Sequence, residues 1–185
     1  MLEQLIVTYC APTLAAVSTG NLFSCRCEEM DDLRGQLDRC SRCVNSKGVR
    51  LRLLRVADGT ALIYVYRPKK LWKHLSDPAV KTFLTAEGYQ MSGLCGMIDQ
   101  MAARLQGDRE FPHEIGVFLG YPLEDVKGFI QNKGNNYLCA GYWKVYHDEP
   151  SARKVFEQFR LCTRLYGQWF LQGTSLRQLT VTALV

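Results

Sequence analysis

Apolar side chains recur at helical spacing in several stretches of the sequence. Over residues 92–106, for example, Leu94, Ile98 and Met101 fall on one side of a predicted helix. Prolines in the first turn, acidic side chains near the start and glycines after the end mark the limits of the other helices. The predicted helices are a short one from Leu2 that Pro12 stops, and others over about residues 28–47, 69–75, 78–87, 92–106, 122–132 and 151–172.

Alternating or short continuous apolar runs, bounded by turn residues, predict strands. The clearest pair is a hairpin joined at Ala57-Asp58-Gly59, where a left-handed backbone is wanted. Because the strands come as hairpins and not in regular alternation with helices, we expect an α+β fold with a mainly antiparallel or mixed sheet and helices packed on it. The predicted strands cover residues 49–56 with 60–67, 13–17 with 22–26, a buried strand at 115–119, an extended stretch at 137–146 and a terminal strand at 179–185.

The composition is that of an ordinary globular protein. Of the 185 residues, 47% are hydrophobic and 22% are charged, so we expect a single domain over residues 1–185 with a sizeable core. Eight cysteines fall short of the roughly 8–10% that marks a secreted disulfide scaffold. The start lacks the basic region of a signal peptide, and no apolar run approaches the about 18 residues of a membrane span. We therefore expect a cytoplasmic protein with free thiols and no membrane contact.

Basic side chains are concentrated in one part of the chain. Residues 34–81 hold 12 basic and 3 acidic side chains, an asymmetry that can mark a surface for polyanions. Aromatic residues also alternate with a lysine over residues 137–146, as they do on some surfaces that bind single-stranded nucleic acid. However, the ribonucleoprotein signature is missing, and aromatic residues on a sheet more often serve packing. Nucleic-acid binding is therefore a disfavoured alternative that the sequence leaves open.

Four thiols could in principle surround a Zn²⁺ ion. They lie in two pairs, Cys25-x-Cys27 and Cys40-x-x-Cys43. Strand alternation puts the first pair on one face, and a helix puts the second pair on neighbouring turns, so convergence is geometrically allowed. The glycine-bearing turn of a zinc knuckle is missing, and the alternative is a set of small buried thiols or a redox pair.

A second candidate site combines Cys10 with the segment Phe111-Pro112-His113-Glu114-Ile115-Gly116. Cys10 could act as a nucleophile whose proton passes to His113, while Glu114 or Asp125 orients the imidazole. Alternatively, Cys10, His113 and Cys139 could ligate iron or zinc. The alternative to both hypotheses is that Cys10 is an inert, half-buried side chain and that His113 is hydrogen-bonded where a strand begins. The sequence lacks the zinc-protease helix signature, the nucleotide-binding loops and the serine-hydrolase elbow, which disfavours those classes.

Several sequence blocks together resemble the domain-of-unknown-function 3793 family, a set of small proteins from anaerobic Gram-positive bacteria. The blocks include Cys10-Ala11-Pro12-Thr13-Leu14, Thr19-Gly20-Asn21-Leu22-Phe23, Tyr64-Val65-Tyr66-Arg67-Pro68, Phe118-Leu119-Gly120-Tyr121-Pro122, Asp125-Val126-Lys127-Gly128-Phe129-Ile130 and Gly141-Tyr142-Trp143-Lys144-Val145-Tyr146. The resemblance runs from Cys10 to Val181 and implies a single cytoplasmic unit without an assigned activity. The two cysteine pairs lie outside the matching blocks, whereas Cys10, His113 and Glu114 lie within them.

We therefore expect a binding module whose pocket is built from the loops at residues 10–21, 113–116 and 120–125. The expected ligand is either a protein partner or a small molecule, and an anionic small molecule is one form of this expectation. The expected ligand contacts come from Thr13, Asn21, Tyr66, Arg67, Tyr121 and Lys127. The two alternatives are a metal or redox protein that holds iron or zinc, and a thiol-dependent enzyme with Cys10 as nucleophile.

Overall fold

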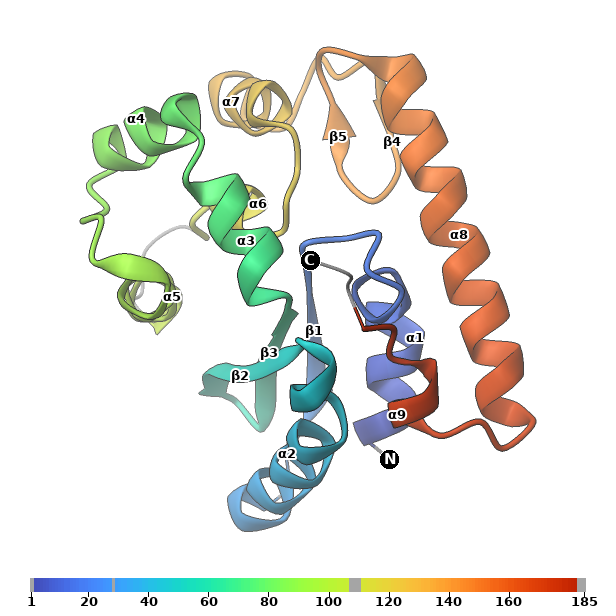
Figure 1. Ribbon diagram of the computed structural model, residues 1–185. Coiled ribbons are helices and arrows are strands. Elements are labelled where there is room, and N and C mark those ends of the chain that lie inside the picture. The colour runs from blue at the N-terminus through green and yellow to red at the C-terminus, as the bar shows by residue number, and fades with distance from the viewer. Residues whose placement is uncertain (1, 28, 107–110, 183–185) are drawn as a thin grey trace. The chain divides into compact units, whose positions relative to one another are not determined.

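A computed structural model of the chain describes residues 2–27, 29–106 and 111–182. Contacts divide the chain into two compact units. Unit 1 comprises residues 1–69 and 158–185, and unit 2 comprises residues 70–157. The chain passes between the units within α3 and again within α8 (Figure 1). That residues 1–185 form a single domain stays a prediction.

Helices occur together with antiparallel strands that are not in regular alternation with them, which confirms the expected α+β class. In chain order they are α1 (Leu2–Leu14), β1 (Gly20–Arg26), α2 (Met30–Val44), the 3₁₀ turn η1 (Asn45–Lys47), β2 (Arg50–Ala57), β3 (Thr60–Tyr66), α3 (Pro68–Leu75), α4 (Pro78–Ala86), α5 (Gly93–Gln106), α6 (Ile115–Phe118), α7 (Leu123–Gln131), β4 (Cys139–Ala140), β5 (Lys144–Val145), α8 (Glu149–Leu171) and α9 (Leu176–Leu179).

Unit 1 contains a three-stranded sheet in which β3 lies between β1 and β2, antiparallel to both. The β2–β3 hairpin forms as predicted. Its turn residues Asp58 and Gly59 have φ angles of 50° and 66°, the left-handed backbone that a two-residue hairpin turn requires. The register sets Ile63 of β3 opposite both Phe23 of β1 and Leu53 of β2.

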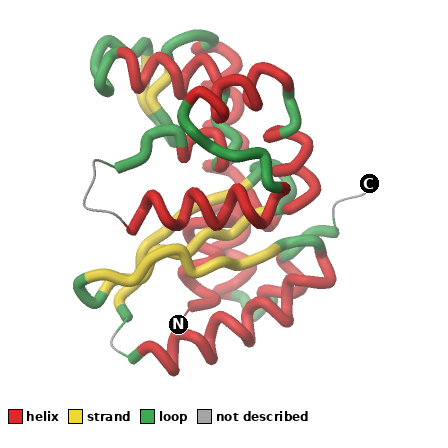
Figure 2. The backbone as a smooth tube through the Cα atoms, turned by 90° about the vertical axis from the view of Figure 1, so that its left-hand side faces the viewer, coloured by secondary structure: helices red, strands yellow, loops and turns green. Residues whose placement is uncertain are grey.

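The core of unit 1 lies between one face of this sheet and the helices α1, α2 and α9. Figure 2 shows α2 running along the strands. Directly opposed residues share a face, so Phe23 and Cys25 of β1 join Ile63 and Ala61 of β3 in this core. The apolar face of α2 reaches the same core through Leu33, Cys40 and Val44.

Unit 2 holds helices α4 to α7, the small β4–β5 hairpin and the start of α8. Asp77 begins α4 by accepting a hydrogen bond from the Ala79 N–H at 2.8 Å. Beside the β4–β5 hairpin, Val145, Ala152 and Phe156 form a small buried cluster. The expected extended stretch at 137–146 is thus a hairpin of two-residue strands.

Pro12 does not stop the first helix, because α1 continues to Leu14. The expected strand at 13–17 is therefore wrong, and β1 pairs with β3 instead. Pro12 lacks the N–H that would donate to the carbonyl four residues earlier, and the helix ends two residues after it. Its own carbonyl accepts the N–H groups of Val17 and Ser18, at 2.9 and 3.0 Å.

The buried run at 115–119 is one helical turn and not a strand, since the N–H of Leu119 donates to the carbonyl of Ile115 at 3.2 Å. A short apolar run has no period that separates the two structures. Gly116 permits close packing, because a Cβ there would lie 2.9 Å from a Val126 methyl carbon. The expected terminal strand at 179–185 is also wrong over its described part, where α9 ends at Leu179; residues 183–185 lie outside the described residues.

Among the helices that the structure describes, none combines the length and the apolar character that a membrane crossing requires.

Candidate functional site

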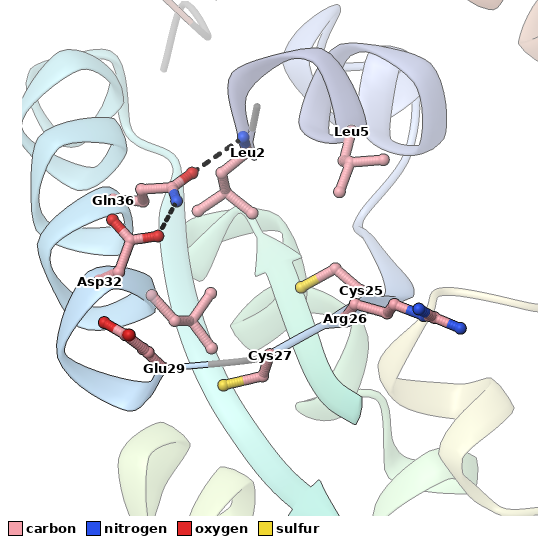
Figure 3. A pocket seen from close by; sticks show the side chains of 9 residues that line it. Leu2, Leu5, Cys25, Arg26, Cys27, Glu29, Asp32 and Gln36 are labelled. Atoms are coloured by element: carbon pink, nitrogen blue, oxygen red, sulfur yellow. Dashed lines mark hydrogen bonds between the residues drawn. The ribbon is translucent and has the colours of Figure 1, made fainter. Parts of the chain in front are cut away.

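A pocket of about 250 Å³ opens in unit 1 between the start of α1, the end of β1 and the start of α2 (Figure 3). We call it the α1–α2 pocket. Its lining residues are Leu2, Leu5, Cys25, Arg26, Cys27, Glu29, Asp32, Leu33 and Gln36. None of the expected ligand contacts belongs to this set.

Local structure explains why two thiols face this pocket. Cys25 lies in β1, and the N–H of Cys27 extends the strand by donating to the carbonyl of Gly59 at 2.8 Å. Residues two apart in a strand point to the same face. Figure 3 shows the side chain of Arg26 pointing away from both sulfur atoms.

The wall opposite the strand comes from the first turns of α2. Gln36 joins the two helices, because its Oε1 accepts the N–H of Leu2 at 3.1 Å and its Nε2 donates to Asp32 Oδ2 at 2.7 Å. Glu29 and Asp32 bring carboxylates to the rim, where acidic side chains also suit the positive end of the α2 dipole. The pocket is therefore apolar and sulfur-lined inside and acidic at its rim.

The two pocket thiols are largely buried, each 9% exposed. Burial, and then the neighbouring Cys27, raise the pKa of the Cys25 thiol. The Sγ of Cys27 lies 3.5 Å from the thioether sulfur of Met30 in the first turn of α2. Three sulfur-bearing side chains thus gather where β1 ends and α2 begins.

The second cysteine pair lies elsewhere on α2. Cys40 lines a separate, smaller pocket of about 120 Å³. Burial, and then Glu3, raise the pKa of its thiol to about 11. Over residues 2–27, 29–106 and 111–182, no group of three or more His, Cys, Asp or Glu side chains could hold a metal ion. The structure therefore does not assemble the four-thiol zinc site. Cys10 lies in unit 1, whereas His113 and Cys139 lie in unit 2, and that set stays a prediction.

Cys10 is a core residue of α1. It is 0% exposed and packs in the hydrophobic cluster of unit 1, and burial raises the pKa of its thiol. A nucleophilic cysteine needs an accessible thiolate. The environment of Cys10 supplies neither access nor the charged form, so the thiol has the character of a small core side chain.

Arg67, an expected ligand contact, is instead 2% exposed and bonded to main-chain carbonyls. Its Nε donates to the carbonyl of Thr13 at 2.6 Å, and its Nη2 donates to those of Leu14 and Val181, each at 2.7 Å. Its Nη1 donates to the carbonyl of Lys47 at 3.2 Å. The guanidinium thus satisfies the last carbonyls of α1 and ties them to the C-terminal segment.

The other expected contacts of unit 1 are also engaged in the fold. The hydroxyl of Thr13, which is buried, donates to Asn21 Oδ1 at 2.6 Å. The ring of Tyr66 stacks on that of Tyr64, with centroids 4.8 Å apart. These placements explain why the blocks at 10–21 and 64–68 carry polar residues without requiring a ligand.

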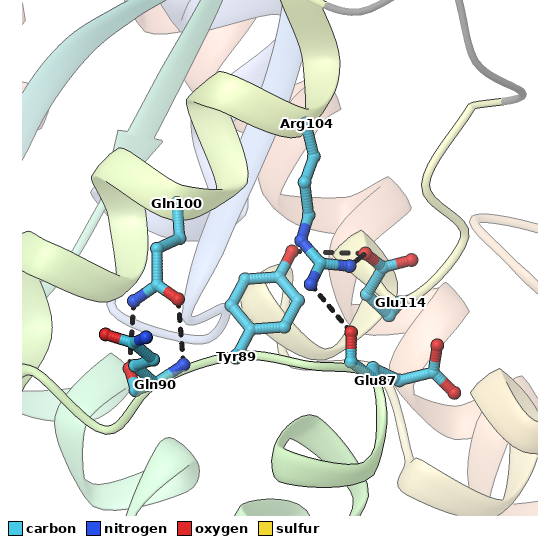
Figure 4. Close-up of polar contacts among 6 residues, drawn as sticks. All are labelled: Glu87, Tyr89, Gln90, Gln100, Arg104 and Glu114. Carbon is cyan, nitrogen blue, oxygen red and sulfur yellow. Dashed lines mark hydrogen bonds and ion pairs between the residues drawn. The ribbon is translucent and has the colours of Figure 1, made fainter.

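Glu114 lies at the centre of a polar network in unit 2 (Figure 4). It is 5% exposed, and its Oε1 accepts hydrogen bonds from Arg104 Nη1 at 3.1 Å and from the Tyr89 hydroxyl at 3.2 Å. Arg104 also donates to the carbonyl of Glu87 at 2.6 Å and lies over the Tyr89 ring, 4.1 Å from its centroid. Burial, and then Glu114, raise the pKa of Tyr89. Glu114 thus joins α5 to the segment before α6.

The remaining expected site residues of unit 2 take part in packing or in surface pairs. The ring of His113 packs against Phe129, with centroids 4.7 Å apart. Tyr121 stacks on Trp143, centroids 4.9 Å apart, and burial raises the pKa of Tyr121 to about 12. The other two are Lys127, whose Nζ lies 3.1 Å from Glu124 Oε1, and Cys139, which is half-buried in β4.

Asp125 has a structural role that the sequence does not reveal. It is 3% exposed, and its carboxylate accepts hydrogen bonds from Trp143 Nε1 and from the main-chain N–H of Tyr146, both at 2.7 Å. A third comes from the N–H of His147 at 3.0 Å. This carboxylate fastens the β4–β5 hairpin to α7 and engages Trp143, while Tyr137 and Tyr142 of the same stretch are exposed.

The described part of the chain therefore has an α+β fold, with a small sulfur-lined pocket in unit 1 and polar networks that serve the fold. Its sequence matches the family described as "Protein of unknown function (DUF3793)" over residues 6–180. The chain belongs to this family. No curated protein and no solved structure matches the chain.

Proposed function

We propose that this protein is a binding module that holds a small cationic ligand in the α1–α2 pocket. The observation that carries the proposal is the lining of that pocket, which combines the thiols of Cys25 and Cys27 and the carboxylates of Glu29 and Asp32 with apolar side chains. The guanidinium of Arg26, which also lines the pocket, points away from the thiols. Carboxylate and sulfur groups favour a positively charged guest. The volume, about 250 Å³, lies below the roughly 300–1,000 Å³ of sites for drug-sized ligands.

The same contacts argue against an anionic ligand. The two cations expected to receive it are Arg67, which is bonded to buried carbonyls, and Lys127, which pairs with Glu124. A thiol-dependent reaction at Cys10 has little support, because that thiol is buried and its pKa is raised. The cytoplasmic location stays part of the proposal and is supported by the free state of the eight cysteines.

A pair of variants on one helix tests the proposal. Leu5→Trp adds a large ring at a position that lines the pocket, whereas Gln4→Trp adds the same ring at an exposed neighbouring position. Native mass spectrometry of the purified protein would detect a retained ligand, and a library of small amines and metal ions would be screened by thermal shift. We expect binding by the wild type and by Gln4→Trp, and loss of binding in Leu5→Trp. Equal binding by all three proteins would place the ligand outside the pocket and overturn the proposal.

A further inference from the structure

Two thiols, those of Cys25 and Cys27, line the α1–α2 pocket, and the thioether of Met30 lies against one of them. Cys25 and Cys27 share a face of the extended strand, about 6.6 Å apart along it at the usual rise of strand residues. The Sγ of Cys27 and the Sδ of Met30 are 3.5 Å apart. Two sulfur atoms that each bind one metal ion at about 2.3 Å in a trigonal arrangement are separated by about 4.0 Å. The Cys27–Met30 pair therefore lies within about 0.5 Å of the spacing of a three-coordinate site.

We propose that Cys25, Cys27 and Met30 form a binding site for a soft monovalent metal ion of the Cu(I) class. This inference rests on the proposed function and names the class of cation that the pocket takes. When the ion binds, each of the two thiols releases its proton to solvent as its sulfur bonds to the metal, and the thioether binds through a lone pair. Two protons leave per ion, and no electron is transferred.

The donor set selects this class of metal. Thiolate and thioether sulfur are soft ligands that favour Cu(I), whereas carboxylate and carbonyl oxygen favour Mg²⁺ and Ca²⁺. A structural Zn²⁺ site takes four ligands in a tetrahedron. Within the described residues no cluster of three or more His, Cys, Asp or Glu side chains is suited to a metal, so the pocket lacks the donors for zinc. Two thiolates and one thioether are sufficient for a low-coordinate monovalent ion.

The surroundings of the sulfur atoms fit this role. The thiols are 9% exposed, and Leu2, Leu5 and Leu33 form apolar walls beside them. An apolar shell limits the access of solvent to a metal site. Glu29 and Asp32 at the rim carry negative charge that attracts a cation toward the opening. The pocket thus combines a route for the ion with a protected inner end.

The first test maps protection in the intact wild-type chain. Under anaerobic conditions, Cu(I) is supplied as its complex with bicinchoninate, a competitor that retains copper against isolated thiols. We expect one equivalent of copper to transfer to the protein. Iodoacetamide labelling followed by peptide mass mapping would then show Cys25 and Cys27 protected about tenfold or more relative to the metal-free protein. The exposed Cys95 should label equally in both.

Variants identify the ligands, and the other cysteine pair provides a matched control. We expect Cys25→Ser and Cys27→Ser each to lower the copper affinity by about a hundredfold or more, since loss of even an outer-shell partner costs about 10–100-fold. Met30→Leu keeps the apolar volume and should lower the copper affinity by about tenfold. Cys40→Ser and Cys43→Ser should leave the copper affinity unchanged. If a serine variant fails to fold, the protection map of the wild type still decides.

The outcomes separate this inference from the proposed function. If copper does not transfer to the protein, the proposed metal site is wrong. Protection at Cys40, Cys43 or Cys95 instead of Cys25 and Cys27 would mean that copper binds elsewhere, which also overturns the proposed site. If Leu5→Trp nevertheless abolishes binding of a small amine, the pocket function stands without the metal. If neither copper nor any amine in the library binds, both proposals fail. Preferential binding of one Zn²⁺ at Cys25 and Cys27 would overturn the selection for a monovalent ion.

Discussion

The Nη2 atom of Arg67, at the end of β3, donates a hydrogen bond of 2.7 Å to the carbonyl of Leu14, the last residue of α1. These two residues are 53 positions apart in the sequence. The carbonyls at the end of a helix have no partner within it, and a buried carbonyl left unpaired is costly. Arg67 supplies a charged partner from a distant strand, beside the Val181 N–H that donates to the same Leu14 carbonyl at 3.0 Å, which makes it a central contact of unit 1.

Replacement of Arg67 should therefore destabilise the protein strongly. Arg67→Met removes the hydrogen bonds of a buried guanidinium to four carbonyls, of which those of Thr13 and Leu14 keep the N–H groups of Ala16 and Val181 as partners. A hydrogen bond to a charged group contributes about 1.5–3 kcal/mol. We expect the free energy of unfolding to fall by about 3 kcal/mol or more, measured by urea denaturation. Arg55→Met, at an exposed arginine of the neighbouring β2, is the control and should change it by less than about 0.5 kcal/mol. Similar small effects of both variants would contradict the structural role of Arg67.

The Glu114–Arg104 pair should contribute to stability as a coupled unit. Glu114 is almost buried, with a side chain 7% exposed, while that of Arg104 is 34% exposed. Glu114→Gln removes the charge that pairs with Arg104 and holds Tyr89. In a double-mutant cycle with Arg104→Met, we expect a coupling energy of about 1–3 kcal/mol from denaturation curves.

The exposed pair of Lys127 and Glu124 offers a comparison for this cycle. Its coupling should lie within about 1 kcal/mol of zero. A Glu114–Arg104 coupling no larger than that value would show that the network of Figure 4 adds nothing beyond a surface ion pair.

His74 should make the protein sensitive to mild acid. Its Nε2 is buried and has no hydrogen-bond partner among the described residues. Burial lowers the pKa of His74 below its ordinary value, against a smaller opposing effect of Asp77. The folded protein then binds fewer protons at this site than the unfolded chain, so the stability falls as the pH drops below about 6.5 and the loss levels off below the folded pKa.

We expect His74→Leu to reduce the loss of melting temperature between about pH 7.5 and pH 5. The exposed His147 provides the control, because His147→Gln keeps the main-chain N–H that binds Asp125 and should leave the pH profile as in the wild type. An unchanged profile in His74→Leu would mean that other groups cause the acid sensitivity.

Cys10 should be chemically inert in the folded state. Its thiol is fully buried and its pKa is raised by burial, so alkylation requires opening of the core. We expect native-state labelling by iodoacetamide to be about a hundredfold slower at Cys10 than at the exposed Cys95, by quantitative peptide mass spectrometry. Rapid labelling of Cys10 at neutral pH would revive the thiol-dependent enzyme as a candidate function.

Local signals in the sequence predicted many of the elements well. The β2–β3 hairpin follows from two adjacent strand patterns and a turn, Asp58-Gly59, whose residues adopt positive φ. The helices α2, α5 and α8 follow from apolar side chains that recur on one face. These features depend on residues close together in the sequence, and the chain contains them before any tertiary contact forms.

The sequence alone therefore determined the α+β class, the main helices, the central hairpin and the shared face of Cys25 and Cys27. Only the tertiary structure decided that α1 runs through Pro12, that residues 115–119 form a helical turn, and that the guanidinium of Arg67 donates to main-chain carbonyls. It also decided which thiols face a pocket. The physical reason is that periodicity reports which side chains share a face, whereas the partner of a buried polar group or a thiol comes from a distant segment that only the fold brings near.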